Sequence, residues 1–140
     1  MLLFLFSMKT VMASGSFDMI HPGHLFYLNE AKKHGDRLVV VVARDANILR
    51  FKGKKPEYSE RERLEHVRSL PMVDKAILGN EGNIFDIISE IKPDVICLGY
   101  DQKPTTMEEL KEELKKRNIK AEVVRIGAYR PDVYKSSKMK

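Results

Sequence analysis

Short apolar runs alternate along the chain with longer segments in which apolar residues recur every three or four positions. The run "LVVVVA" at residues 38–43 is continuous and β-branched, which is typical of a strand buried on both faces. Runs of this kind predict five β-strands, at residues 10–13, 38–43, 75–78, 95–98 and 122–126.

The segments between these strands carry helix signals with readable ends. The first helix begins with Pro22 at its first position and ends at Gly35. The second begins at Ser59, which forms a capping box with Glu62, and continues to Leu70. Two further helices are predicted. Isoleucines recur at helical spacing over residues 83–91, and a threonine followed three positions later by an acid begins the helix at residues 106–118.

Strands that alternate with helices imply right-handed crossovers and a parallel sheet with helices on both faces. We therefore expect one α/β domain of three layers, a Rossmann-like arrangement with a five-stranded parallel sheet flanked by helices. Ligands of such sheets bind beyond the carboxyl ends of the strands, where the strand order reverses. The loops expected at this edge are residues 14–24, 44–57, 79–82 and 99–105.

The composition is that of a globular protein, with 43% hydrophobic and 32% charged residues. A net charge of +5 favours an anionic partner such as a nucleotide, a phosphorylated metabolite or nucleic acid. Basic residues are not interleaved with aromatic residues in a stacking pattern, so we expect no nucleic acid. The single cysteine, Cys97, excludes an internal disulfide and a multi-cysteine zinc site, and fits a cytoplasmic protein.

The N-terminal segment "MLLFLFSM" is apolar but short. A helix that spans a bilayer needs about 20 apolar residues, so we expect no membrane attachment. The basic region and cleavage site of a signal peptide are also missing. We interpret residues 1–7 as an extension, with a role in a longer first strand or a dimer contact, and residues 8–140 as the functional domain.

The segment "HPGH", from His21 to His24, follows the first predicted strand at the ligand edge. Zinc needs three or four ligands, and the remaining histidines, His34 and His66, do not complete a set, so we expect no metal held by the protein. An ordinary helix start with incidental polar residues is one interpretation. A phosphate site has more physical support, because a helix N-terminus presents free N–H groups, Gly23 admits an anion, and two imidazoles can donate hydrogen bonds.

Two other polar features lie at this edge. Asp18, next to the end of the first strand, either touches a ligand or caps the turn. The basic run of Lys52, Lys54 and Lys55 is either a solvated charge run or a loop in which one lysine closes on phosphates when substrate binds.

Several segments resemble a known family. "GSFDMIHPGH" resembles the strand–loop–helix signature of the HxGH nucleotidyltransferases, in which a G-[ST]-F-D start is followed by H-x-G-H. The cytidylyltransferase-like members, and most closely the archaeal FAD synthases, are similar in the segments "VVVVARD", "KGKKPEYSERERLEHV", "VDKAILG" and "EGNIFDIISEIKPDVICLGYDQ". The resemblance covers nearly the whole chain from Met8.

The resemblance implies a set of site residues. His21 and His24 would stabilise the triphosphate as pyrophosphate departs, and Arg63, rather than Arg61, would be the catalytic arginine that binds phosphate. Further nucleotide contacts would come from Ser16, Phe17, Pro22, Gly23, Asp101 and Tyr129. Further phosphate contacts would come from Lys52, Lys54 and Lys55, and from Ser136 and Ser137 in a shortened form of the family's C-terminal phosphate-binding segment.

The activity implied is nucleotidyl transfer, with FMN adenylyltransferase favoured: ATP and FMN give FAD and pyrophosphate, with Mg²⁺ bound to the nucleotide. Two alternatives use the same nucleotidyl-transfer chemistry: a glycerol-3-phosphate cytidylyltransferase, which uses CTP, and a sugar-phosphate adenylyltransferase. A nucleotide-binding regulatory module is the alternative from another class, but both signature histidines are present, which favours an enzyme. The resemblance also implies a homodimer.

Overall fold

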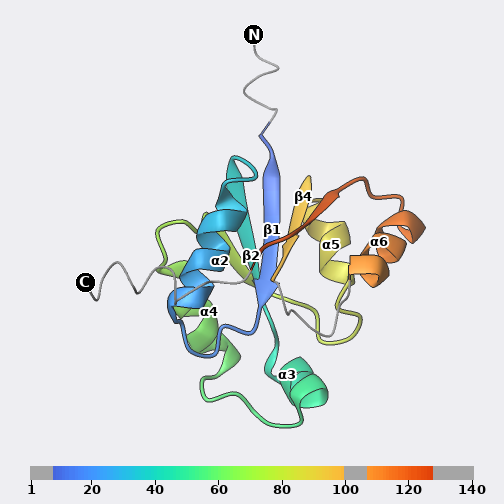
Figure 1. The fold of residues 1–140 in the computed structure, drawn as a ribbon. Helices are drawn as coiled ribbons and strands as arrows, with labels where there is room; N and C mark the ends of the chain where they lie inside the picture. Colours follow the sequence, from blue (N-terminus) through green and yellow to red (C-terminus); the bar gives the residue numbers. More distant parts are fainter. Residues whose placement is uncertain (1–7, 100–106, 128–140) are drawn as a thin grey trace.

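The predicted apolar runs form one parallel sheet (Figure 1). The computed structural model describes residues 8–99 and 107–127. The strands are β1 (Thr10–Gly15), β2 (Arg37–Val42), β3 (Lys75–Leu78), β4 (Val95–Leu98) and β5 (Glu122–Arg125). They lie in the order β3-β2-β1-β4-β5. The predicted α/β fold with a five-stranded parallel sheet is confirmed.

Helices occupy every connection between the strands: α2 (Pro22–Lys32), α3 (Asp45–Lys52), α4 (Glu60–Arg68), α5 (Asp86–Ile91) and α6 (Met107–Lys116). Helix α3 corrects the expectation of a loop over residues 44–57. Asp45 lies in its first turn, and Gly53, with φ 77°, ends it in the left-handed conformation. The helix is 8 residues long and buries only Asn47 and Ile48, so it has little apolar periodicity in the sequence.

Each face of the sheet has its own apolar core. On one face, Leu28 of α2 and Val67 of α4 pack against alternate residues of the strands. On the other, Ile88 of α5 and Leu110 of α6 pack against the residues between them. Because both faces are covered, the central strands are continuous apolar runs rather than alternating ones.

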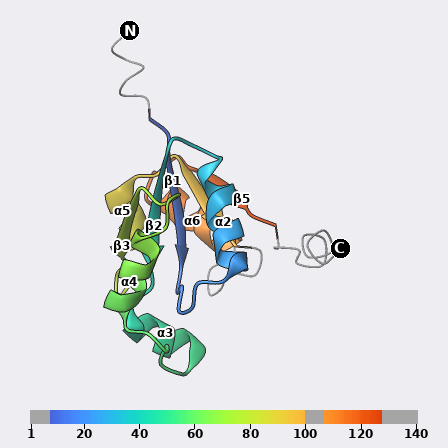
Figure 2. The same ribbon diagram turned by 90° about the vertical axis from the view of Figure 1, so that its left-hand side faces the viewer.

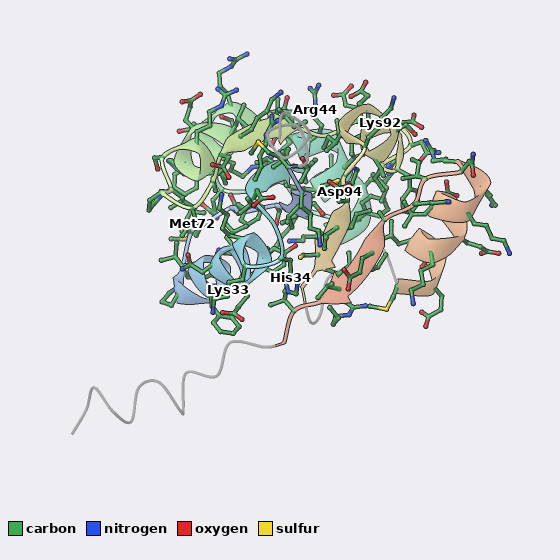
Figure 3. All side chains as sticks on the ribbon, turned by 90° about the horizontal axis from the view of Figure 1, so that it is seen from above. Lys33, His34, Arg44, Met72, Lys92 and Asp94 are labelled. Atoms are coloured by element: carbon green, nitrogen blue, oxygen red, sulfur yellow. The ribbon has the colours of Figure 1, made fainter. Side chains whose placement is uncertain are left out.

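Three aspartates fix the starts of the strands at the edge opposite to the predicted ligand edge. Asp36, Asp74 and Asp94 stand directly before β2, β3 and β4. Their carboxylates accept hydrogen bonds from the backbone N–H groups of Lys9 (2.8 Å), Leu38 (2.7 Å) and Thr10 (2.8 Å). Figure 3 looks toward the end at which the strands begin, where Asp94 is labelled. These aspartates therefore have a structural role.

The strand order reverses at β1. The chain builds β2 and β3 on one side of β1 and then crosses to build β4 and β5 on the other. The carboxyl end of β1 leads into α2, and α3 lies beyond this end, outside the two helical layers (Figures 1 and 2). A ligand crevice is therefore expected where β1 and β4 separate.

Candidate active site

The two signature histidines cap the helix that they begin. His21 is the N-cap of α2, and its Nδ1 accepts a hydrogen bond from the Gly23 N–H at 3.1 Å. The His24 Nδ1 in turn accepts from the His21 N–H at 3.3 Å. The two rings are stacked, with centroids 3.8 Å apart. This is a capping box built from histidines, so the helix-start interpretation of "HPGH" agrees with the geometry.

The same capping box determines which ring nitrogen is the donor. A neutral imidazole has one N–H, and the nitrogen that accepts a hydrogen bond does not carry it. Because Nδ1 is the acceptor in both His21 and His24, each neutral ring carries its proton on Nε2. Two Nε2–H donors thus stand at the N-terminus of α2, where the helix dipole favours an anion.

His24 stays neutral well below neutral pH. Burial lowers the pKa of this imidazole, the nearby His21 and Lys52 lower it further, and only a hydrogen bond with the Met19 backbone favours the charged form. The resulting pKa is about 4. At neutral pH His24 is therefore a neutral hydrogen-bond donor rather than a cation.

The loop between β1 and α2 has a constrained backbone. Phe17 has a φ of 51°, a left-handed conformation that is rare for a large side chain. Its ring is 1% exposed and lies 5.3 Å, between centroids, from the ring of His24. A Cβ at Gly15 would lie 2.9 Å from the Phe17 ring, so glycine is required for this close approach. Phe17 therefore supports His24 from the interior.

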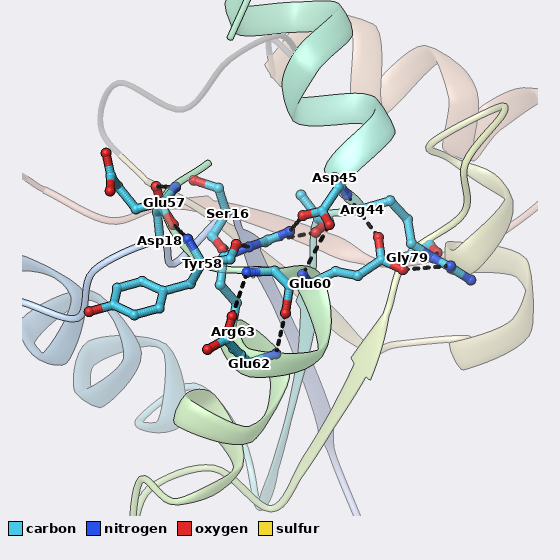
Figure 4. A network of polar contacts seen from close by, with 12 residues as sticks. Ser16, Asp18, Arg44, Asp45, Glu57, Tyr58, Glu60, Glu62, Arg63 and Gly79 are labelled. Atoms are coloured by element: carbon cyan, nitrogen blue, oxygen red, sulfur yellow. Dashed lines mark hydrogen bonds and ion pairs between the residues drawn. The ribbon is translucent and has the colours of Figure 1, made fainter. Parts of the chain in front are cut away.

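Arg63, which was predicted to bind phosphate, has a buried side chain. Its side chain is 0% exposed, so the guanidinium does not face a ligand space. It donates hydrogen bonds to the carbonyls of Tyr58 (3.0 Å), Ser16 (2.8 Å) and Ala43 (2.8 Å), and pairs with Asp45 at 2.6 Å (Figure 4). Arg63 thus holds the Ser16 loop in place from inside the protein.

A reciprocal cap, which the sequence pattern did not predict, joins α3 to α4. The Asp45 N–H donates to the carboxylate of Glu60 at 2.9 Å, and the Glu60 N–H donates to that of Asp45 at 3.2 Å (Figure 4). Arg44 pairs with Glu60 at 3.1 Å and donates to the Gly79 carbonyl. The signal available was an acid at the first position of each helix, but α3 itself was not predicted.

Asp18 caps a turn, one of the two roles considered for it. Its carboxylate accepts hydrogen bonds from the backbone N–H groups of Glu57 (2.7 Å) and Tyr58 (2.9 Å), as Figure 4 shows. Burial raises the pKa of Asp18, but these two hydrogen bonds and the charges of Arg63 and Lys52 outweigh it and hold the pKa below its usual value. The ionised carboxylate therefore ties the loop between β1 and α2 to the segment before α4.

The three predicted lysines lie in different surroundings. Lys52, at the end of α3, donates from Nζ to the Ser16 hydroxyl at 3.2 Å. Lys54 and Lys55 are exposed beyond that helix. The structure therefore brings Lys52 to the loop that holds Ser16 and Phe17, next to the N-terminus of α2.

The remaining predicted site residues, Asp101, Tyr129, Ser136 and Ser137, lie outside the described residues, as does the extension 1–7. Within residues 8–99 and 107–127, no group of three or more His, Cys, Asp or Glu side chains is arranged to hold a metal ion. No helix in the same ranges has the length and apolar character needed to cross a membrane.

Comparisons with known proteins agree with this geometry. The cytidylyltransferase-like family matches residues 12–140. An FAD synthase of Ferroglobus placidus is 58% identical over 121 residues, which cover 86% of this chain and 78% of that protein. An FAD synthase of Methanothermobacter thermautotrophicus is 52% identical over 126 residues, which cover 88% and 82%.

A solved structure with a similar fold and sequence is also found. The crystal structure of a lipopolysaccharide core biosynthesis protein from Thermoplasma volcanium matches with a TM-score of 0.83 and 48% identity. The match covers 89% of this chain and 100% of that one. With its family match, its relatives and its histidine-capped helix at the switch point, this chain belongs to the cytidylyltransferase-like family.

Proposed function

We propose that the protein is an FAD synthase, which transfers AMP from ATP to FMN and releases pyrophosphate. The observation that carries the proposal is the pair of imidazole Nε2–H donors at the N-terminus of α2, in a chain that is 58% identical to an FAD synthase over most of its length. An oxygen of the FMN phosphate attacks the α-phosphorus of ATP. The new P–O bond forms as the bond to the β-phosphate bridging oxygen breaks, and pyrophosphate leaves with that electron pair.

The described residues fit the electrostatic demands of this step. Charge builds up on the departing pyrophosphate, and preorganised donors stabilise it more than they stabilise the ground state. His21 and His24 supply imidazole N–H donors, and Lys52 supplies a positive charge beside Ser16. Arg63 and Asp18 act by fixing the loop that presents these groups. No side chain needs to act as a covalent nucleophile.

We expect the Mg²⁺ ion to bind together with the nucleotide. Divalent cations in phosphoryl-transfer sites bridge phosphate oxygens and neutralise their charge. The described residues offer no carboxylate cluster for the ion. The ATP phosphates would therefore supply most of its ligands. A cytoplasmic location and a homodimer stay predictions from the single cysteine and from the family resemblance.

A sugar-phosphate adenylyltransferase is the second candidate. It is favoured by the 48% identity to a protein of lipopolysaccharide core biosynthesis. The phosphate donors described above would serve either acceptor, because both reactions transfer AMP to a phosphate monoester. The acceptor therefore has to be identified by experiment.

A matrix of substrates tests the proposal. The purified full chain is incubated with Mg²⁺ and either ATP or CTP, each paired with FMN, glycerol 3-phosphate or a sugar phosphate, and pyrophosphate release is measured. We expect release with ATP and FMN. Release with CTP and glycerol 3-phosphate, or with ATP and a sugar phosphate, but none with ATP and FMN, would overturn the proposal.

A further inference from the structure

The last turn of α3 lies beyond the carboxyl ends of the strands and is tied to two loops there (Figure 1). Lys52 ties it to the loop after β1, because its Nζ donates to the Ser16 hydroxyl at 3.2 Å. Arg50 ties it to the loop after β3, because its guanidinium donates to the Gly82 carbonyl at 3.2 Å. The last turn of α3 therefore spans from one of these loops to the other, at the ligand edge of the sheet.

Phe51 stands between these two contacts, on the inward face of α3. Residues three and four positions apart lie on the same face of a helix. Phe51 is therefore in line with Ile48 and Asn47, which are 6% and 5% exposed. Phe51 itself is 46% exposed, and it belongs to neither apolar core of the described residues. The inward face of α3 thus ends in an aromatic side chain that is only partly covered.

Arg50 restrains one side of this ring. Its guanidinium carbon lies 4.8 Å from the centroid of the Phe51 ring, in a cation–π contact. The same guanidinium donates to the side-chain oxygen of Asn47 at 2.9 Å and to the Gly82 carbonyl. The ring is therefore oriented before a ligand arrives, and a preorganised surface loses less entropy on binding.

Phe51 and its neighbour Lys52 present an aromatic surface beside a positive charge. Planar heteroaromatic rings stack on aromatic side chains, and phosphate groups form charge-assisted hydrogen bonds with cations. A ligand with both a planar ring and a phosphate matches these two features. FMN has both groups, joined by a flexible polyol chain, whereas a sugar phosphate has no such ring.

ATP also carries a planar ring and phosphates, but the topology of the sheet places it elsewhere. Nucleotides of open α/β sheets lie at the switch point of the strand order, which here is between β1 and β4. Helix α3 follows β2, which is on the other side of β1. Phe51 therefore lies on the side of β1 that the nucleotide leaves to the acceptor.

We propose that Phe51, oriented by Arg50, binds the isoalloxazine ring of FMN by stacking. The inference rests on the proposed function, because it names a contact with the acceptor of that reaction. Phe51 carries no group that acts on the reacting phosphates. It therefore affects the binding of FMN and leaves the transfer of AMP unchanged.

The test is Phe51→Ala, which removes the ring. FMN binding is measured by fluorescence titration of the full chain with Mg²⁺ and α,β-methylene ATP, which cannot release pyrophosphate. The dissociation constant for FMN should rise about tenfold, because one planar ring loses its stacking partner. The KM for FMN should rise equally, while the KM for ATP is unchanged and kcat stays within about twofold. Phe51→Tyr keeps an aromatic ring and should bind FMN as the wild type does.

Leu49→Ala is the matched control. Leu49 is 44% exposed on the same helix, but it lies two positions from Phe51 and so on a different face. This variant should bind FMN as the wild type does. Two partial ligands separate ring from phosphate: Phe51→Ala should lose affinity for riboflavin, which lacks the phosphate, and keep its affinity for ribose 5-phosphate, which lacks the ring.

Three results would each overturn the inference: unchanged FMN affinity in Phe51→Ala, an equal loss of FMN affinity in Leu49→Ala, or a loss of ATP affinity in Phe51→Ala in place of FMN affinity. The last result would assign the ring of Phe51 to adenine.

These outcomes separate the two proposals. A wild-type protein that binds FMN but forms no FAD overturns the proposed function, and the FMN affinity of Phe51→Ala still decides the role of Phe51. Full FAD synthesis with unchanged FMN affinity in the variant overturns only the inference about Phe51. A wild-type protein that does not bind FMN overturns both.

Discussion

At the scale of single residues, the proposed function gives the histidines of "HPGH" two roles that are usually separate. Each ring caps the start of α2 through Nδ1, so the proton of each neutral ring is on Nε2. Serine or asparagine would cap the helix as well, but their side chains are too short to offer a second polar atom beyond the cap. Under the proposed function, these two positions need histidine to bind phosphate and not to begin the helix.

The substitution His21→Asn separates these roles. Asparagine is among the best N-cap residues, so the variant should keep the thermal stability of the wild type. It lacks the Nε2–H donor, so turnover should fall by about 10²-fold or more, and His24→Ala should fall comparably. Steady-state rates and melting curves are measured together.

His34→Ala is the matched control, because His34 lies past the other end of α2 (Figure 3) and should retain full activity. Wild-type turnover in a folded His21→Asn protein would show that the histidines serve only as caps.

The lowered pKa of His24 predicts how the free energy of unfolding depends on pH. Its pKa is about 4 in the folded protein, against an ordinary value of 6.5. Between these values the unfolded chain binds a proton at His24 that the folded chain does not bind, so the free energy of unfolding falls as the pH drops from 6.5 to about 4. His24→Gln keeps a capping-box residue at the same position but does not titrate.

Urea unfolding between pH 4 and 7 checks this contribution. The free energy of unfolding of the wild type should depend more steeply on pH than that of His24→Gln. Equal slopes in the two proteins would argue that His24 is not held neutral in the fold.

At the scale of elements, the ligand edge is held together by Arg63. The guanidinium bonds to the loop after β1, the end of β2, the first residue of α3 and the segment before α4. Arg63 was predicted to bind phosphate because the resembled family has a phosphate-binding arginine on this helix. Its burial, which the helical pattern alone did not predict, indicates a positioning role.

Arg63→Ala should therefore act first on stability. Three part-buried carbonyls lose this donor and the Asp45 carboxylate loses its ion pair, which is expected to lower the free energy of unfolding by about 3 kcal/mol or more. Arg61→Ala, at an exposed position on the same helix, should stay within about 0.5 kcal/mol of the wild type. Denaturant unfolding measures both. An Arg63→Ala protein with unchanged stability and lost turnover would instead support direct phosphate contact.

The parts of the fold that were predictable are those with strong local signals. Strands β3 and β4 have their predicted bounds, and the capping box at Ser59 is present. Helix α3 was missed because it is stabilised by polar contacts from Asn47, Arg50 and Asp45 rather than by an apolar face. The strand-start aspartates were missed because each joins residues far apart in the sequence.

At the scale of the whole molecule, the fold brings the histidine-capped start of α2 and the side chain of Lys52 to the same edge of one sheet. Two crossovers in opposite directions from β1 create this arrangement, and the aspartates at the opposite edge keep the strands in register. The proposed transfer of AMP to FMN then depends on position and charge rather than on a covalent nucleophile.

The most direct test of this account follows the phosphate of FMN. FMN labelled with ¹⁸O in its phosphate is incubated with ATP, Mg²⁺ and the full chain, and the products are weighed by mass spectrometry. We predict FAD and pyrophosphate in equal amounts, with the label retained in FAD and absent from pyrophosphate, because the FMN oxygen becomes the bridge to the AMP phosphorus. No FAD, or label in the pyrophosphate, would contradict the account.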